Sequence, residues 1–203
     1  MKLEIRELKP KDYIKAMEFS ISGMHFNWYI KNEFLLHLYV RYFFYSELAR
    51  SSHVIAAYVG NNLVGVLLAE IYDKPKFTLR WWEKFYIRMF DVLQHLFAAK
   101  GINAYNLANK KMFETYKNHY IPDGEIVFLA SDINRKIKGV GTILLNELEI
   151  REPGKEVFLY TDNGCTYQFY ENRDFVLTAS QNIKIKVGRN ITKLTTMLFR
   201  KKL

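Results

Sequence analysis

The segment EIVFLASDINRKIKGVGT (residues 125–142) decides the fold of this chain. Ile126 to Ala130 is a compact apolar run, which is typical of a buried central strand. A polar loop follows it, and a helix is predicted from about Gly139 to Ile150, where Pro153 and Gly154 end it. The segment is therefore predicted to form a strand, a tight loop and the start of a helix.

The two glycines of this loop suggest a phosphate-binding turn. Gly139 and Gly141 let the backbone approach a ligand that side chains would obstruct. Free amides at a helix amino terminus, with Lys136 and Lys138 beside them, favour a pyrophosphate. The pattern matches neither Gly-x-x-x-x-Gly-Lys-Ser/Thr nor Gly-x-Gly-x-x-Gly. Taken alone, the two glycines are more typical of a tight strand-to-helix turn that binds nothing.

Further strands and helices are predicted on both sides of this segment. Residues 53–59 and 63–72 form the clearest hairpin, joined by turn residues at 60–62. Residues 74–120 have helical apolar spacing and are predicted to be a helical insertion between strands 3 and 4. The other predicted elements are a strand near residues 3–8, helices over 13–23 (capped by Asp12) and about 28–48, a strand over 157–160, a short helix that reaches Tyr170, and strands over about 175–187 and 192–200.

Two motifs resemble those of the GNAT superfamily of N-acetyltransferases. Residues 136–141 resemble the family's acetyl-CoA loop, Gln/Arg-x-x-Gly-x-Gly/Ala, with Lys136 in first place. Residues 163–175 resemble Asn-x-x-Ala-x-x-hydrophobic-Tyr-x-x-x-Gly-Phe, from which Thr166 and Asp174 depart. The order of predicted elements also matches the family, apart from the insertion at 74–120. The resemblance implies a single α/β (α+β) acetyltransferase domain over residues 1–203, with a central mixed, mostly antiparallel twisted sheet flanked by helices.

The resemblance also implies acetyl-CoA as the co-substrate and indicates which residues bind it. The strand before the loop would pair with the pantetheine arm, and an amide near Leu129 would polarise the thioester carbonyl. Asn163 would hydrogen-bond the arm, cap the following helix, or do both. The predicted cofactor-binding residues are Leu129, Ala130, Ser131, Lys136, Ile137, Lys138, Gly139, Val140, Gly141, Thr142, Asn163 and Tyr167.

Tyr170 and Glu125 are the predicted catalytic residues. Tyr170 stands where the family's tyrosine protonates the leaving sulfur, a task that suits a phenol; the alternative is that it packs in the core. The segment from Glu125 resembles the Glu-hydrophobic-x-Phe segment of the histone-acetyltransferase branch. A partly desolvated carboxylate there could take a proton from an ammonium substrate, directly or through water; the alternative is a solvated residue at a turn. The implied reaction is direct acetyl transfer from acetyl-CoA to a primary amine of a small molecule or peptide.

Composition narrows the remaining function classes. The chain has 203 residues, 49% of them hydrophobic, and one cysteine, Cys165, so no intramolecular disulfide can form and a reducing, cytoplasmic location is expected. No two of the five histidines lie three or four residues apart, so no metal is expected. The amino-terminal residues lack the apolar run of a signal peptide, and no apolar run has the length of a membrane span, so no membrane partner is expected.

The net charge of +9 and the high aromatic content leave alternatives open. Residues 74–120 carry nine Lys/Arg against three Asp/Glu, and residues 181–203 carry seven against none. One alternative is a basic nucleic-acid-associated protein, for which residues 84–88 would be a contact surface; another is a CoA-binding module without turnover. The aromatic residues near 26–45 and 81–86 would line an amine pocket, pack the insertion onto the core, or form a homodimer interface.

Overall fold

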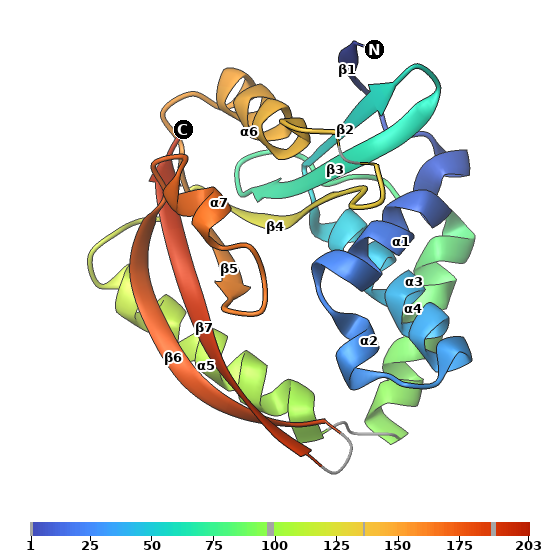
Figure 1. The fold of residues 1–203 in the computed structure, drawn as a ribbon, viewed down its shortest axis with the longest axis vertical. Helices are drawn as coiled ribbons and strands as arrows, with labels where there is room; N and C mark the ends of the chain where they lie inside the picture. Colours follow the sequence, from blue (N-terminus) through green and yellow to red (C-terminus); the bar gives the residue numbers. More distant parts are fainter. Residues whose placement is uncertain (1, 97–99, 136, 188–189) are drawn as a thin grey trace.

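The computed structural model describes residues 2–96, 100–135, 137–187 and 190–203. In these residues seven strands form one sheet in the order β1-β2-β3-β4-β5-β7-β6 (Figure 1). Every neighbouring pair is antiparallel except β4 and β5, which are parallel. The strands are β1 (Leu3–Arg6), β2 (His53–Val59), β3 (Asn62–Ile71), β4 (Gly124–Ser131), β5 (Glu156–Asp162), β6 (Val176–Val187) and β7 (Asn190–Lys202).

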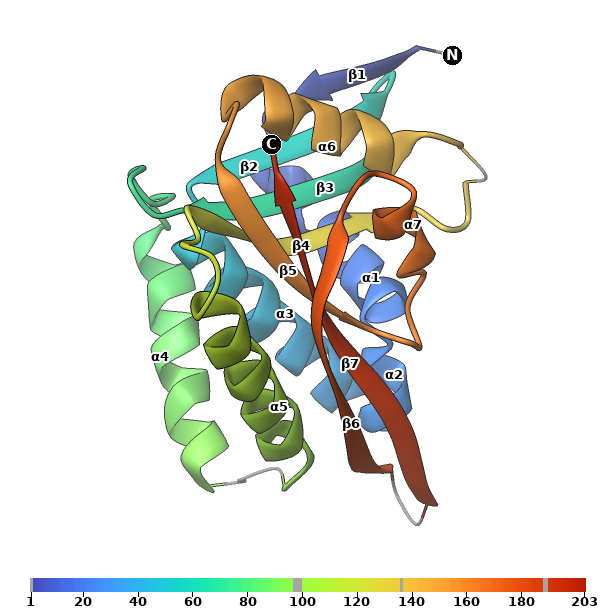
Figure 2. The same ribbon diagram turned by 90° about the vertical axis from the view of Figure 1, so that its left-hand side faces the viewer.

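Helices cover both faces of this sheet (Figure 2). On one face, α1 and α3 pack on β2–β4, α4 packs against α3, and α5 packs on β5–β7. On the other face, α6 packs on β1–β4 through side chains such as Leu144 and Leu148. The helices are a short 3-10 helix (Pro10–Asp12), α1 (Tyr13–Gly23), α2 (Phe26–Tyr29), α3 (Glu33–Arg50), α4 (Trp81–Leu96), α5 (Lys100–Lys117), α6 (Val140–Arg151) and α7 (Gln168–Glu171).

The fold class predicted from the sequence is confirmed, including the helical insertion between β3 and β4, which consists of α4 and α5. The single helix predicted over about 28–48 is wrong, because the structure divides this region into α2 and α3. The side chain of Asn32 accepts a hydrogen bond from the Leu35 amide (3.0 Å) and so caps α3. Asp12 precedes α1 but makes no side-chain cap; its carboxylate accepts the hydroxyl of Tyr58 (2.8 Å) instead.

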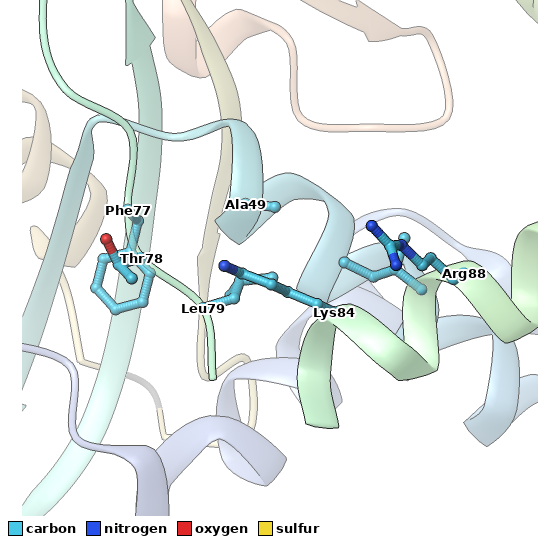
Figure 3. Close-up of a pocket in the computed structure, with 7 residues that line it drawn as sticks. Ala49, Phe77, Thr78, Leu79, Lys84 and Arg88 are labelled. Carbon is cyan, nitrogen blue, oxygen red and sulfur yellow. The ribbon is translucent and has the colours of Figure 1, made fainter. Parts of the chain in front are cut away.

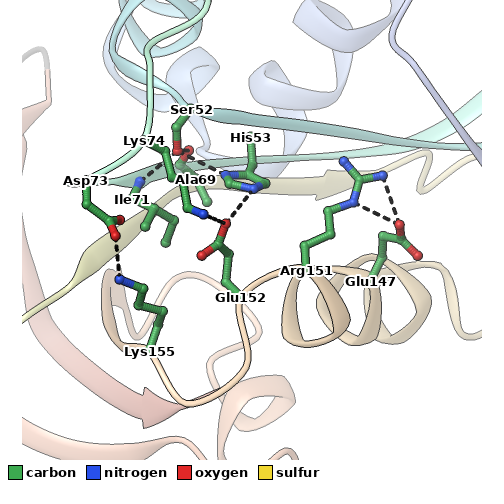
Figure 4. A network of polar contacts seen from close by, with 10 residues as sticks. All are labelled: Ser52, His53, Ala69, Ile71, Asp73, Lys74, Glu147, Arg151, Glu152 and Lys155. Atoms are coloured by element: carbon green, nitrogen blue, oxygen red, sulfur yellow. Dashed lines mark hydrogen bonds and ion pairs between the residues drawn. The ribbon is translucent and has the colours of Figure 1, made fainter.

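The carboxyl end of α6 is fixed to the β2–β3 hairpin by charged side chains (Figure 4). Glu152 is buried, and its Oε1 lies 3.1 Å from Nε2 of His53 and 3.4 Å from Nζ of Lys74. Nearby, Lys155 Nζ lies 2.8 Å from Oδ2 of Asp73. Because the helix is held at this end and packed along its apolar face, its amino terminus has a defined place beside β4.

Candidate active site

β4 and β5 are parallel neighbours that separate soon after they meet. Their register contains only two pairs, Gly124 with Val157 and Glu125 with Phe158, whereas β4 pairs with β3 along its whole length. Beyond Glu125, the edge of β4 that faces β5 therefore has no strand partner in the described residues (Figures 1 and 2). An unpaired edge presents free amide and carbonyl groups, to which an extended ligand can bind as an added strand.

The amides of Leu129 and Ser131 point toward this open edge. The Asp132 amide donates to the carbonyl of Val64 (2.9 Å) and so faces β3. Backbone groups alternate in direction along a strand, so Ala130 also faces β3, and Leu129 and Ser131 face β5. Of the three β4 residues predicted to lie beside the cofactor, two therefore have amides that face the open edge.

Val127 marks a bulge in β4 just beyond the point where the two strands separate. Phe128 lies opposite Leu68 and Ile126 lies opposite Ala69, so Val127 has no opposite residue. Because of the bulge, Val127 and Phe128 both contact the core under α1 and α3, while Ile126 contacts the core under α6. A bulge redirects the backbone groups beside it, and here it does so at the edge left free by β5.

The loop after β4 ends in a left-handed glycine. Gly139 has φ +83° and precedes α6 without a capping side chain. The Ile143 amide bonds to the Gly139 carbonyl (3.0 Å), so the amides of Val140, Gly141 and Thr142 have no partner within the helix. A Cβ at Gly139 would meet no atom within 4 Å, so the space beside this turn is open. This first turn can bind an anion.

The other predicted loop residues differ in their placement. Lys138 is exposed next to Gly139, and Ile137 is partly buried against the core under α6. Lys136 lies outside the described residues. Asp132 organises the start of the loop, because its Oδ1 accepts the Asn134 amide (3.1 Å) and its Oδ2 lies 3.5 Å from Nζ of Lys15 in α1.

Gly141 allows α7 to pack on the first turn of α6. A Cβ at Gly141 would lie 2.7 Å from Cζ of Phe169, which is closer than side chains tolerate. The Arg173 guanidinium lies over the Phe169 ring (3.7 Å to its centroid), and its Nε donates to Oγ1 of Thr142 (3.1 Å). Arg173 thus places a cation at the amino end of α6. Sequence reasoning missed it, because no motif or spacing distinguished it from other surface arginines.

Tyr170 lies in α7 among aromatic rings. Its ring is 5.6 Å from that of Phe175 and 6.3 Å from that of Phe199, centroid to centroid. Burial, and to a smaller extent Cys165, raises the pKa of Tyr170 above its usual range, so the phenol keeps its proton at neutral pH. Tyr170 thus packs in the core, which is one role considered from the sequence. It also keeps the proton that the other role, protonation of a leaving sulfur, requires.

The segment between β5 and α7 extends the sheet and contacts α1. Asn163 Oδ1 accepts the Thr195 amide (2.9 Å), and the Asn163 amide donates to the Thr195 carbonyl (3.0 Å), so this residue extends the pairing of β5 with β7. The Cys165 thiol approaches the carbonyl of Gly23 (3.5 Å), and burial is the main reason that its pKa is raised to about 11. A protonated thiol is a poor nucleophile. Tyr167 packs, partly buried, against the core under α6.

Glu125 lies at the point where β4 and β5 separate, and its partner is Arg50. Arg50, the last residue of α3, places a guanidinium nitrogen 2.7 Å from Oε2 of Glu125. Its Nε lies 2.8 Å from Oε2 of Glu47, without hydrogen-bond geometry, and 3.9 Å from Oε2 of Glu70. Glu70 stands directly opposite Glu125 across the β3–β4 pair, and Lys76 pairs with it at 2.9 Å. Three carboxylates therefore surround one arginine.

Burial controls the protonation of this cluster. It raises the pKa of Glu125 above the ordinary value, and Arg50 opposes that rise. Burial also raises the pKa of Glu47, to about 7. The Glu125 side chain is only 15% exposed, so the alternative of a solvated turn residue is wrong. Sequence reasoning missed Arg50, Glu47 and Glu70, because the inserted helices α4 and α5 separate all three from Glu125 in the chain.

The histidines and aromatic residues singled out in the sequence make structural contacts in the fold. The described residues contain no group of three or more potential metal ligands. His25 stacks on Trp28 and its Nε2 lies 2.8 Å from the carbonyl of Gly164. Most of the aromatic residues near 26–45 pack on one another or on α4, as Tyr42 does by stacking on Phe90 (4.5 Å between centroids).

Neither the known protein-family models nor the curated proteins contain a match to this chain. Solved structures do match it. The PaiA N-acetyltransferase of Thermoplasma acidophilum, in complex with coenzyme A, is 17% identical with a TM-score of 0.54, and the match covers 100% of both chains. Naa50 of Arabidopsis thaliana, in complex with the bisubstrate analogue CoA-Ac-MVNAL, is 14% identical with a TM-score of 0.53, again over 100% of both chains.

A GNAT-family acetyltransferase from Bacillus cereus is 9% identical with a TM-score of 0.51, over 100% of this chain and 98% of the other. At these identities the likeness concerns the arrangement of the backbone. The order of helices and strands along the chain and the glycine turn before α6 are features on which the sequence resemblance also rests. The chain has the fold of the GNAT acetyltransferases.

Proposed function

We propose that this protein is an N-acetyltransferase that moves an acetyl group from acetyl-CoA to a primary amine of a small molecule or peptide. The observation that carries the proposal is the free edge of β4 that runs, past the bulge at Val127, into the open turn at Gly139. An extended amide-containing arm with a pyrophosphate at its end fits that shape. The arm would bond to the edge amides, and the pyrophosphate would occupy the first turn of α6.

Glu125, where β4 leaves β5, and Tyr170, in α7, would supply the proton transfers. Glu125 would take a proton from the ammonium group of the acceptor, which frees the nitrogen lone pair to attack the thioester carbonyl carbon. The Leu129 amide would donate a hydrogen bond to the carbonyl oxygen as negative charge develops there. Tyr170 would give its phenolic proton to the sulfur as the carbon–sulfur bond breaks. The acetylated nitrogen would lose its second proton, through water, to the Tyr170 phenolate, and Glu125 would release its proton to solvent. The products are an N-acetylated amine and free CoA.

The raised pKa values suit these roles. A carboxylate whose pKa lies above the ordinary value is a stronger base than a solvated one, while the Arg50 guanidinium opposes the rise and favours the ionised form of Glu125. A buried phenol donates a hydrogen bond without losing its proton before the thiolate forms. The CoA thiolate is the only strong base that the reaction generates beside Tyr170, so protonation there occurs late.

A binding experiment followed by a turnover assay tests the proposal. Acetyl-CoA should raise the melting temperature, and S-acetylpantetheine, which has the arm without the pyrophosphate, should raise it much less. Thiol release should then be measured with aminoglycosides, polyamines, amino acids and peptide amino termini. No stabilisation by acetyl-CoA would refute the cofactor assignment. Stabilisation without turnover on any amine would favour a CoA-binding module that does not catalyse transfer.

A further inference from the structure

The outward face of α4 carries large apolar side chains that nothing in the described chain covers. Trp81 is 79% exposed, Phe85 62%, Met89 40% and Val92 63%. These residues recur at intervals of three and four, so they share one side of the helix. Single exposed apolar residues are common, but a contiguous row of four on one helix face marks an interaction site.

This face is distinct from the one that packs α4 onto the protein. Tyr86 donates its hydroxyl to the carbonyl of Leu38 in α3 (2.9 Å), and Trp82 meets Tyr45 edge to face (5.5 Å between centroids). Glu83 is buried on the same inner side. The helix is therefore already anchored, and its outer apolar face is not needed to hold it in place.

The charged residues beside the outer face are basic. Lys84 and Arg88 are exposed, whereas the two described acidic residues of α4 face inward. Glu83 accepts the Arg80 amide (2.8 Å), and Asp91 accepts the hydroxyl of Tyr42 (2.7 Å). An approaching surface meets positive charge along one side of the apolar row and no exposed carboxylate of this helix.

A depression of about 340 Å³ lies between α4, the end of α3 and the segment before α4. Figure 3 shows Lys84 reaching from α4 to the side of Leu79, with Arg88 farther along the helix; both line the depression together with Ala49 at the end of α3. The other lining residues are Phe77, Thr78, Leu79 and Ile87. A small anionic group could enter between the two basic side chains, while apolar side chains form the rest of the wall.

We propose that the outer face of α4 docks on an anionic lipid bilayer. Trp81, Phe85, Met89 and Val92 would enter the boundary between headgroups and acyl chains, and a lipid phosphate would bind between Lys84 and Arg88 in the depression. Tryptophan and phenylalanine together with flanking Lys and Arg are the features of a helix that lies in the membrane interface. No described helix is long and apolar enough to cross a bilayer, so the contact is peripheral.

The basic side chains and the direction of Tyr86 favour an anionic bilayer over a second copy of this chain or a nucleic acid. A second copy of the chain, packed face to face about a twofold axis, would bring the Lys84 and Arg88 of both copies together without an exposed acidic partner on α4. A nucleic acid would need the basic and aromatic residues of 84–88 to face one way, yet Tyr86 points inward to Leu38. In Figure 2, α4 lies at the edge opposite the loop before α6, so docking leaves the candidate cofactor site open to water.

Vesicle flotation tests the proposal. The protein should float with vesicles of phosphatidylcholine and phosphatidylglycerol in equal amounts, and much less with phosphatidylcholine alone. Trp81→Ala with Phe85→Ala should lower partitioning by about tenfold or more. Lys84→Gln with Arg88→Gln should lower vesicle partitioning by about fivefold for each residue and should make the partitioning less dependent on salt.

Matched variants test whether binding depends on the α4 face itself or only on total charge and exposed apolar surface. Lys9→Gln with Lys11→Gln removes the same charge from exposed residues before α1, and Ile121→Ala shortens an apolar side chain that is 88% exposed. Both should bind vesicles like the parent protein. Equal loss in the control and the α4 variants would overturn the proposal. So would vesicle-independent dimerisation that Trp81→Ala abolishes, or retention of an oligonucleotide that Lys84→Gln abolishes.

Discussion

The two ends of β4 present different kinds of chemical group: main-chain amides at one end and charged side chains at the other. At the carboxyl end, main-chain amides of Leu129 and Ser131 and the turn at Gly139 form the candidate cofactor site. At the amino end, side chains from α3 and β3 surround Glu125 with two carboxylates and one guanidinium. Main-chain groups have fixed charge and direction, whereas clustered side chains titrate. The first end is thus suited to binding, and the second to proton transfer.

Removing the base should give the largest effect. Glu125→Gln keeps the size of the side chain but cannot accept a proton, so kcat should fall by about a hundredfold or more. The Kd for acetyl-CoA, measured by calorimetry, should change little, because the cofactor would bind at the other end of β4. Glu70→Gln is the matched control, since it removes a charge from the same cluster at the residue opposite Glu125. Equal losses in the two variants would show that the cluster acts only as structure.

Stability should depend on pH through Glu47. Its pKa is about 7 in the folded protein, above the value of an unfolded chain, so the folded state binds more protons between about pH 4.5 and 7. Its contribution to stability is therefore present at low pH and is lost as pH rises through that window. Glu47→Gln should raise the free energy of unfolding at pH 8 by about 2–3 kcal/mol and much less at pH 5. Urea denaturation at both pH values measures this, and an equal change at both would contradict it.

A glycine substitution at the main-chain end should change binding rather than turnover chemistry. Gly139→Ala places a Cβ at φ +83°, a conformation that costs an ordinary residue about 1–2 kcal/mol, and it should weaken acetyl-CoA binding by about tenfold as the turn relaxes. Gly154→Ala is the control, because Gly154 also has positive φ (+82°) and open space for a Cβ but lies beyond α6. Both variants should lose stability, and only Gly139→Ala should raise the Kd. A normal Kd for Gly139→Ala would place the phosphates elsewhere.

The sequence predicted the backbone elements of the main-chain end, a strand followed by a glycine turn and a helix, but not the side-chain cluster around Glu125. The hairpin at 53–72 and the turn at Gly139 follow from residues that are neighbours in the chain, because turn chemistry and strand alternation are local. Arg50 meets Glu125 only after β2, β3 and both inserted helices have been placed between them. The positive charge of Arg50 also does not indicate which of the chain's carboxylates it will pair with.

The break between α2 and α3 shows the same limit on a smaller scale. Apolar residues continue at helical spacing through this region, so periodicity predicted one helix. Asn32 nevertheless begins a new helix by capping it with its own side chain. A cap competes with helix continuation locally, and the apolar pattern cannot show which prevails, because it also depends on how α2 packs against α1 and α3.

The smallest expected effect concerns the backbone that supports the main-chain end. Asp174 stands where the GNAT motif has glycine. It is exposed and has φ +63°. Asp174→Gly relieves this strain but adds chain entropy to the unfolded state, so the unfolding free energy should rise by only about 0.5 kcal/mol. His25, the other described non-glycine residue with positive φ, is the contrast: His25→Gly relieves similar strain but loses the stacking on Trp28 and the contact with Gly164, so it should destabilise. Urea unfolding of both variants distinguishes the two contributions, and destabilisation by Asp174→Gly would mean that this carboxylate stabilises the turn after α7 by more than its backbone strain costs.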